Sequence, residues 1–524
     1  MKKNNKIIVL LFSVIALSFT ACIDNSLNVN PNNATELAMS RDDLKVGAFF
    51  TQMQRNVFIV GADRDGAYQR QQNLAGDVFA GYMGATNNWF GGSNSLTYNP
   101  NPDWYNEMFN NGYGNIMSPW NEIQKITKEE FPQKYAAATI IKVAGMHRVT
   151  DTYGPIPYTE YGTQIYIPYD SQEKVYNTFF EELTEAVDIL TDFYAETAGA
   201  RLIAAEYDYI YQGNPLSWIK FANSLRLRLA MRISYVNPTK ARTEAEAAIN
   251  HVHGVMTSVG DIAALNRNSR FTYNHPLNEI CYNFTDVKMG ATMDSYLNGY
   301  SDGRREIYFN RASSGNYVGV RSGITISSKD TYANPVFSDL NVSTGTSVVW
   351  MNPAEVFFLR AEGAVRGWSM GGTAQELYEQ GITTSFTYTG APNVTAYISS
   401  TAVPAAYTDP QTSGNSNAAL GTVTVRWSDA ATDEARLEKI ITQKWIAMYP
   451  DGQEAWSEFR RTAYPKVFPV RVNNSGGRVD TSVQIRRLPY SSSEYRDNAA
   501  NVAAATALLG GADHGGIKLW WDKK

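Results

Sequence analysis

Apolar residues recur at intervals of three and four positions along most of the chain, which is the spacing of amphipathic helices. In the segment 171–193, with Ser171 as a helix cap, one helix face carries Val175, Phe179, Leu183, Val187 and Leu190. The same spacing predicts helices over 41–58, 104–128, 133–150, 171–193, 215–234, 239–252, 353–368, 374–387 and 433–449. Successive helix pairs of this kind indicate a mainly α fold with tetratricopeptide-like packing, although no clean repeat of about 34 residues is present.

The helical pattern is interrupted in two places. Between 255 and 350, short aromatic and β-branched segments alternate with Gly, Ser and Asn, which predicts loops and minor strands. The interval 388–432 is long and rich in turn residues, which is typical of an insertion. We therefore expect a single helical domain over 41–524 that carries loop-rich insertions.

The N-terminus has the pattern of a secretion signal. Three lysines precede the apolar run IIVLLFSVIALSF, and the sequence TAC follows it. Because a membrane span takes about 20 residues, this run is short for a transmembrane anchor. The pattern resembles a bacterial lipoprotein signal and predicts a signal peptide at 1–21, lipidation of Cys22 and an Asn-rich tether at 22–40. An ordinary secretory signal cut near Cys22 is the alternative.

Composition narrows the class of protein. The chain of 524 residues has a formal net charge of -5, and its charged residues form no long run of one sign. It therefore lacks the basic footprint of a nucleic-acid binder, and we expect no nucleic-acid partner. Tyrosine is the commonest aromatic residue, with 32 Tyr against 22 Phe and 11 Trp. Tyr and Trp combine an apolar face with a polar edge, which suits half-exposed recognition surfaces.

Metal and cofactor chemistry finds little support in the sequence. The five histidines include no HExxH pair. No GxxxxGK[ST] loop occurs, and no GxGxxG follows a strand pattern. We expect neither a metal nor a cofactor.

One motif suggests an enzyme. The sequence GWSMGG at 367–372 has the GxSxG spacing of a serine hydrolase with Ser369 as nucleophile, and Asp433 or Asp451 with His514 could complete a triad. Such a nucleophile needs a strand before it and a helix after it, whereas both flanks here have helical spacing. A turn between two helices is favoured, and a secreted serine hydrolase using Ser369 remains an alternative function.

The segment 79–105 combines aromatic residues with amides and glycines. Its sequence, FAGYMGATNNWFGGSNSLTYNPNPDWY, predicts a loop. Flat aromatic faces can cover the C–H face of a sugar ring, while amide side chains both donate to and accept from its hydroxyls. Packing of these aromatics within the loop is the alternative for each residue. The candidates for sugar binding in this segment are Tyr82, Asn87, Asn88, Trp89, Phe90 and Tyr98.

Several separate blocks together resemble the starch-utilisation-system D family, also called SusD/RagB. Beyond the signal ending at Cys22 and the following LNVNPNNAT, these blocks are DTYGPIPYTEYG at 151–162, PAEVFFLRAEGAVRGW at 353–368, LYEQGI at 377–382, KIITQKWIAMYPDGQEAWSEFRRTAYP at 439–465 and RRLPYSSSEYRDN at 486–498. They stand in the family's order along most of the chain. Such agreement is more specific than the lone GxSxG motif.

The resemblance implies a noncatalytic outer-membrane lipoprotein that binds oligosaccharides and sits as a lid on a SusC-like TonB-dependent transporter. It implies a right-handed superhelix of four tetratricopeptide-like helical pairs, with loops that present the ligand site, and a lipid anchor that holds the protein at the membrane, facing the cell exterior. A binder of a non-sugar nutrient such as a peptide is an alternative, because a fold does not dictate its ligand. The resemblance adds candidate ligand residues near 296–308, namely Tyr296, Tyr300, Asp302, Arg304 and Tyr308.

Overall fold

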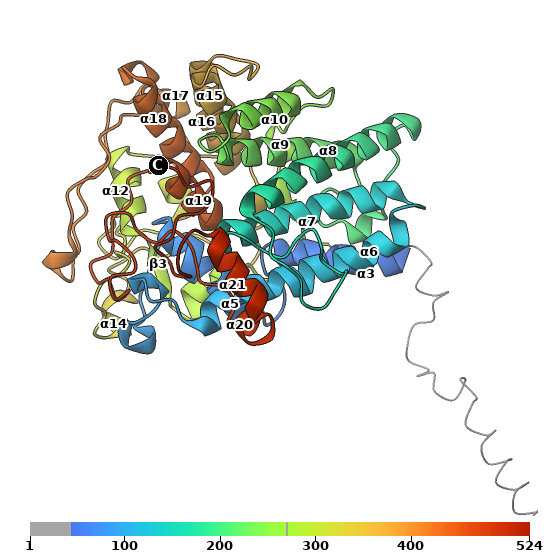
Figure 1. Ribbon diagram of the computed structural model, residues 1–524. Coiled ribbons are helices and arrows are strands. Elements are labelled where there is room, and N and C mark those ends of the chain that lie inside the picture. The colour runs from blue at the N-terminus through green and yellow to red at the C-terminus, as the bar shows by residue number, and fades with distance from the viewer. Residues whose placement is uncertain (1–42, 269–270) are drawn as a thin grey trace, which may run out of the picture. The chain divides into compact units, whose positions relative to one another are not determined.

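The computed structural model describes residues 43–268 and 271–524, and most of their regular structure is helical (Figure 1). The helices up to residue 250 are α3 (Leu44–Val57), α4 (Asp65–Tyr68), α5 (Pro102–Gly112), α6 (Ser118–Thr127), α7 (Pro132–Tyr153), α8 (Gln172–Glu196), α9 (Pro215–Arg232) and α10 (Pro238–Asn250). The later ones are α11 (Pro276–Asn278), α12 (Ala291–Gly299), α13 (Arg305–Tyr308), α14 (Lys329–Tyr332), α15 (Pro353–Val365), α16 (Ala374–Thr389), α17 (Val394–Ile398), α18 (Asp433–Ala447), α19 (Gly452–Thr462), α20 (Ser492–Asp497) and α21 (Ala499–Leu508). The predicted mainly α architecture is confirmed.

Four of these helices begin with the dipeptide Asn-Pro. The asparagine is the N-cap and its side chain accepts a backbone N–H of the first turn, while the proline occupies the first helical position, where no N–H is needed. The same local signal therefore starts helices in distant parts of the chain. The four capping asparagines are Asn101, Asn214, Asn237 and Asn352.

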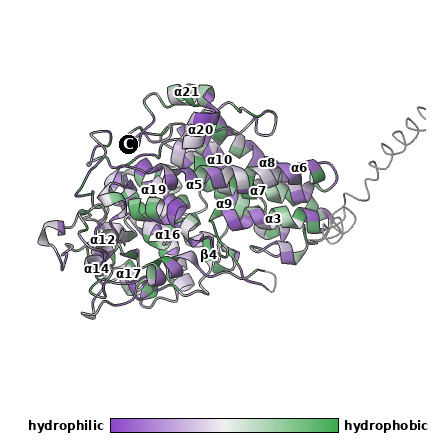
Figure 2. Ribbon diagram, turned by 90° about the horizontal axis from the view of Figure 1, so that it is seen from below, coloured by the Kyte–Doolittle hydropathy of each residue, from purple (hydrophilic) through white to green (hydrophobic). Residues whose placement is uncertain are grey.

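The long helices pack in sequence order. Helix α7 packs against α6 and α8, α8 against α9, and α9 against α10, so that neighbours in the chain are neighbours in space (Figure 1). Helix α9 also contacts α15, which packs against α16 and α18. All five apolar residues predicted to share a face of α8 are buried. Hydrophobic and hydrophilic residues alternate along these helices (Figure 2), and this amphipathic character gives the tetratricopeptide-like stacking of helical pairs.

Two small antiparallel ribbons tie the loop-rich regions together. Strand β1 (Met83–Ala85) pairs with β3 (Val287–Met289), and β2 (Ala263–Leu265) pairs with β4 (Val348–Met351). The minor strands expected between 255 and 350 are thus present. The β1–β3 pair fixes the start of the loop at 86–99 against a segment about 200 residues further along the chain.

A network of buried charges joins the helices at the centre of the fold. Arg232 of α9 bonds Glu454 and Glu458 of α19, and Arg461 bonds both Glu362 of α15 and Glu458. These side chains are at most 3% exposed. Burial by itself raises the pKa of Glu454, but the nearby positive charges of Arg232, Arg228 and Lys444 lower it to about 2. Each buried charge of this network thus lies beside a charge of opposite sign, which offsets the cost of removing it from water.

The predicted signal peptide, Cys22 and the tether lie outside the described residues. From Gly47 to Lys524 the chain forms one compact unit. Among residues 43–268 and 271–524, no helix is both long enough and apolar enough to cross a membrane.

Candidate functional site

The segment 79–105 forms a strand, a tightly turned loop and the start of α5. Two short 3-10 turns at Trp89–Gly92 and Ser95–Thr97 shape the loop between β1 and α5. Phe90, Gly91 and Gly92 all have positive φ angles, of 53°, 62° and 82°. Two glycines accommodate this left-handed run without strain, whereas Phe90 adopts it at an energetic cost. The loop therefore holds an aromatic side chain in a backbone conformation that such residues rarely take.

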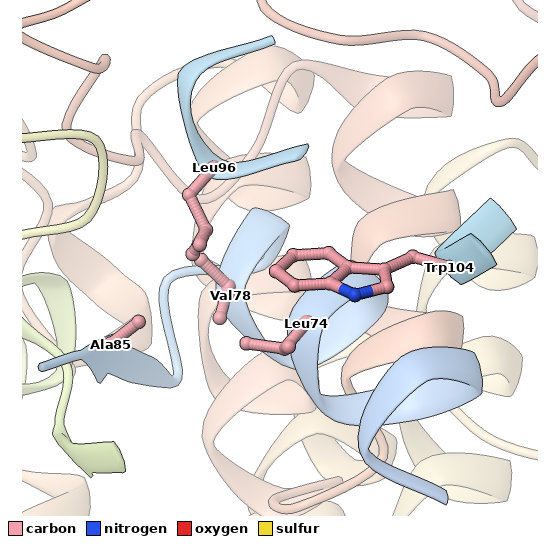
Figure 3. Packing of buried hydrophobic residues seen from close by; sticks show 5 residues of the cluster. All are labelled: Leu74, Val78, Ala85, Leu96 and Trp104. Carbon is pink, nitrogen blue, oxygen red and sulfur yellow. The ribbon is translucent and has the colours of Figure 1, made fainter. Parts of the chain in front are cut away.

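Two aromatic rings of this loop rest on a third. The Trp89 and Phe90 ring centroids each lie 5.5 Å from that of Trp104, with Trp89 edge-on at 83°. Trp104 is 8% exposed and belongs to a hydrophobic cluster with Leu74, Val78, Ala85 and Leu96 (Figure 3). Trp89 is only partly buried against this cluster, and Phe90 is 51% exposed. The loop thus presents an aromatic platform, defined here as Trp89 and Phe90, on a rigid hydrophobic base.

The amides of the loop divide into two groups. The buried Asn94 side chain accepts from Leu96 N–H and donates to the Trp89 carbonyl, so it holds the turn together. Asn87 donates to Asp286 at 3.3 Å and accepts from the Asn88 N–H. The exposed Asn88 side chain makes no hydrogen bond to the described residues. Asn88 is therefore the loop amide whose donors and acceptors are free for a ligand.

The remaining predicted ligand residues lie in the protein interior. Tyr296 and Tyr82 pack against Trp445 with ring centroids at 5.3 and 5.2 Å, and Tyr308 packs against Tyr449 at 4.7 Å. The hydroxyls of Tyr82, Tyr296 and Tyr300 donate to backbone carbonyls inside the protein, that of Tyr300 to the Val423 carbonyl. Burial raises the pKa of these phenols, which leaves them neutral. The buried predicted residues are Tyr82, Tyr98, Tyr296, Tyr300, Asp302, Arg304 and Tyr308.

Asp302 and Arg304 illustrate how candidates of the 296–308 segment are engaged inside the fold. Both side chains are 0% exposed and form an ion pair at 2.7 Å. Arg304 also donates to Ser385 and Gln443, so its guanidinium ties the 302–308 turn to α16 and α18. The structure thus places Tyr296, Tyr300, Asp302, Arg304 and Tyr308 in the interior, which differs from the expected exposed loop, and a role for them in ligand binding stays a prediction.

The GxSxG motif lies in the turn between two helices. Helix α15 ends at Val365 and α16 begins at Ala374, so no strand precedes Ser369. Ser369 is exposed, and its N–H donates to Glu246 at 2.8 Å. Asp451 is committed to an ion pair with Arg148 at 3.1 Å, and Asp433 pairs with an arginine of its own helix. The geometry of a nucleophile elbow is absent from this segment.

Within the described residues, no three His, Cys, Asp or Glu side chains are grouped to hold a metal ion. Cys281 is buried, and burial raises the pKa of its thiol to about 12. It therefore stays protonated and has little nucleophilic character at neutral pH.

Comparisons with known proteins agree along almost the whole chain. The SusD-like family model, described as Susd and RagB outer membrane lipoprotein, matches residues 26–522. A chitin-binding SusD homolog from Flavobacterium johnsoniae is 42% identical, with a TM-score of 0.88, and the match covers 92% of this chain and 99% of that one. A SusD homolog from Bacteroides uniformis is 40% identical over 92% and 100% of the two chains with a TM-score of 0.84. One from Bacteroides vulgatus is 36% identical over 92% and 98% with a TM-score of 0.87. No curated protein matches the chain.

Proposed function

Because the chain belongs to the SusD-like family of outer membrane lipoproteins, we propose that it is a noncatalytic protein that captures oligosaccharides and delivers them to a TonB-dependent transporter. The observation that carries the glycan proposal is the platform of Trp89 and Phe90, which stands on a buried hydrophobic cluster and is flanked by Asn88. Aromatic rings that are exposed on a loop with such a buried support are suited to recognition of a ligand.

The platform can bind a sugar ring without any chemical step. The exposed face of Phe90 offers a flat apolar surface for the C–H face of a pyranose, and Trp89 extends that surface toward Trp104. Asn88 can both donate to and accept from ring hydroxyls beside it. Asp286, which already accepts from Asn87, holds that neighbouring amide in place.

The first ligand to test is an oligomer of N-acetylglucosamine. The Flavobacterium johnsoniae homolog, 42% identical to this chain, is described as chitin-binding. If two aromatic faces and a few hydroxyl hydrogen bonds contribute roughly 1 kcal/mol each, binding sums to about 4 to 7 kcal/mol. This corresponds to a dissociation constant from about 1 mM to about 10 μM, which suits capture followed by release.

The glycan proposal is tested by calorimetric titration of the protein without its signal. N-acetylglucosamine oligomers should bind the wild type, and Phe90→Ala should weaken binding at least several-fold while the melting temperature stays the same, because this side chain is half exposed. The matched control is Tyr166→Ala, an aromatic residue 63% exposed on another loop. Equal affinity of wild type and Phe90→Ala would remove the platform from the site. Titration with a peptide mixture tests the alternative nutrient class.

Anchoring and delivery form a separate part of the proposal. The apolar run ending at TAC supports lipidation of Cys22, with the protein held at the outer membrane and facing the cell exterior. Cys22→Ser should release the protein into the soluble fraction, and the wild type should co-purify with a transporter from solubilised membranes. Membrane retention of Cys22→Ser with an uncleaved N-terminus would instead favour a transmembrane anchor.

A further inference from the structure

A pocket of about 240 Å³ is lined in part by residues between Tyr98 and Tyr105, which follow the platform loop in the chain. It lies at the start of α5 beside Tyr495 of α20, two helices that contact each other, and residues 513–515 of the C-terminal segment complete its lining. At about 30 Å³ per water molecule, the pocket has room for about eight waters or for one sugar ring with its substituents. Its lining includes Asn99, Tyr105, Arg478, Tyr495, Asp513 and His514.

One wall of the pocket is a turn that holds Arg478. Gly476 and Gly477 have positive φ angles of 62° and 82°, so the chain reverses tightly just before the arginine. The Ser475 hydroxyl accepts the Val479 N–H, and the Arg478 Nε donates to the Ser475 carbonyl at 3.0 Å. The two terminal nitrogens of the Arg478 guanidinium make no hydrogen bond to the described residues. The turn thus positions a guanidinium with its terminal donors uncommitted.

His514 adds a neutral donor to the same pocket. Its Nδ1 accepts the Gly516 N–H at 3.1 Å, which puts the ring proton on Nε2. Partial burial and the positive charges of Arg487 and Arg478 lower the pKa of His514, so the ring is neutral at pH 7. A Cβ at Gly516 would lie 2.0 Å from the Arg478 carbonyl oxygen, so only glycine lets these two walls approach.

The single carboxylate in the lining is already satisfied. Asp513 forms an ion pair with Arg487 and accepts from the Tyr490 N–H at 3.0 Å and the Tyr495 hydroxyl at 2.6 Å. With Asp513 and Arg487 cancelling each other, Arg478 sets the charge of the pocket, which is positive.

The rest of the lining is suited to a ring. Tyr105 is partly buried and Tyr495 is 47% exposed, and Pro100, Pro102 and Pro489 supply apolar walls. Asn99 donates to Ser93 at 2.7 Å, which leaves its amide oxygen as an acceptor for a hydroxyl. Apolar walls with a few convergent polar groups are the usual composition of a small-ligand site.

We propose that this pocket is a second ligand site, which accepts an acidic sugar and binds its carboxylate through Arg478 and His514. A guanidinium is the side chain best matched to a planar carboxylate, since two of its N–H groups can donate in parallel. The proposal rests on the proposed function only in taking the ligand to be a sugar. The pocket and the platform use different side chains, so each can be removed without the other.

The test is titration with D-glucuronate and with D-glucose at low ionic strength. The wild type should bind glucuronate at least about tenfold more tightly than glucose, because a charge-assisted hydrogen bond forms only with the acid. Arg478→Gln should abolish that preference, and added salt should weaken it. Arg242→Gln, which removes the same charge from an exposed ion pair on α10, should leave it unchanged.

The outcomes separate this proposal from the platform. Absence of any preference for glucuronate in the wild type, or an unchanged preference in Arg478→Gln with intact folding by circular dichroism, would overturn the second site. Inorganic phosphate that competes as well as glucuronate would also overturn it, because the site would then bind anions rather than a sugar. If Arg478→Gln still binds N-acetylglucosamine oligomers, the pocket and the platform are independent sites. If the wild type does not bind these oligomers, that result counts against the glycan proposed for the platform and leaves the pocket untouched.

Discussion

The buried charge network of the helices and the platform loop handle polar groups in opposite ways. Arg232, Glu454 and Glu458 are almost fully excluded from water, and each bonds another member of the network. In the loop, Asn88 is exposed without a partner among the described residues, and Phe90 turns half its surface to solvent. The difference teaches where function can reside: groups satisfied inside the fold hold it together, and groups left unsatisfied on a rigid support remain for a ligand.

The largest effect is expected from breaking the charge network. Arg232→Met removes the one guanidinium that bonds three buried carboxylates at once, those of Asp151, Glu454 and Glu458, which should lower the free energy of unfolding by about 3 to 5 kcal/mol. Urea denaturation measures this loss. Arg496→Met, which breaks an exposed pair, should change stability by less than about 1 kcal/mol. Similar losses in the two variants would show that the network does not stabilise the fold.

A second effect concerns the pH dependence of stability. Burial, with a contribution from the nearby Asp451, raises the pKa of Asp77 to about 8. The folded state therefore holds a proton that the unfolded state releases near pH 4, so this group's contribution to stability is present below about pH 4 and is lost as pH rises to 8. Asp77→Asn should remove this dependence. Its stability relative to wild type should rise between pH 5 and 8 by up to about 1.4 kcal/mol per pH unit, measured by urea denaturation.

An identical pH profile in wild type and Asp77→Asn would show that Asp77 is ionised in the folded protein. Subtracting the variant from the wild type isolates this one group, since other buried groups such as His147, whose pKa burial lowers to about 3, titrate in both proteins.

Trp89→Ala sharpens the comparison because Trp89 belongs to the platform and also packs against the buried hydrophobic cluster beneath it. Its ring packs edge-on against Trp104, so its removal should lower the free energy of unfolding by roughly 1 to 2 kcal/mol. It should also weaken glycan binding several-fold. A melting curve alongside calorimetric titration measures both. A stability loss above about 3 kcal/mol with unchanged affinity of the folded protein would assign Trp89 to the core alone.

The smallest effect is expected at Ser369. Ser369→Ala should change neither stability nor glycan affinity, because this exposed serine stands between α15 and α16 and only its backbone N–H is engaged. Labelling with a serine-directed fluorophosphonate, compared between wild type and variant, checks the enzyme alternative. Specific labelling of Ser369 would contradict the noncatalytic function.

The helices could be predicted because their signals are local. The predicted 215–234 and 353–368 correspond to α9 and α15, and both begin at an Asn-Pro cap that needs no tertiary context. Helix α19 was not predicted. Its sequence is amphipathic, but all of its residues are buried, including Glu454, Glu458, Arg460 and Arg461, so its polar face meets charged partners inside the fold instead of water.

The candidate site was predicted only in part. Sequence indicated Asn87 to Phe90 correctly as a loop, because glycines and amides dominate there. The sequence could not show whether the tyrosines near 296–308 are buried or exposed. A tyrosine can place its hydroxyl against a partner inside the fold, as Tyr300 does, or against a ligand, and the residue type is the same in both cases. Of the residues that line the pocket, only Tyr98 was among the sequence candidates, because Arg478 and His514 lie far from it in the chain.

By itself, the sequence determined the mainly α architecture, the helix starts and the blocks that identify the family, all of which depend on residues close together in the chain or on motifs read in order. Only the tertiary structure decided which aromatic residues face solvent, which charges are partnered and where a pocket opens. Burial and charge pairing are set by contacts between segments such as Arg304 with α16 and α18, or Arg478 with the C-terminal turn, and such contacts exist only once the chain has packed.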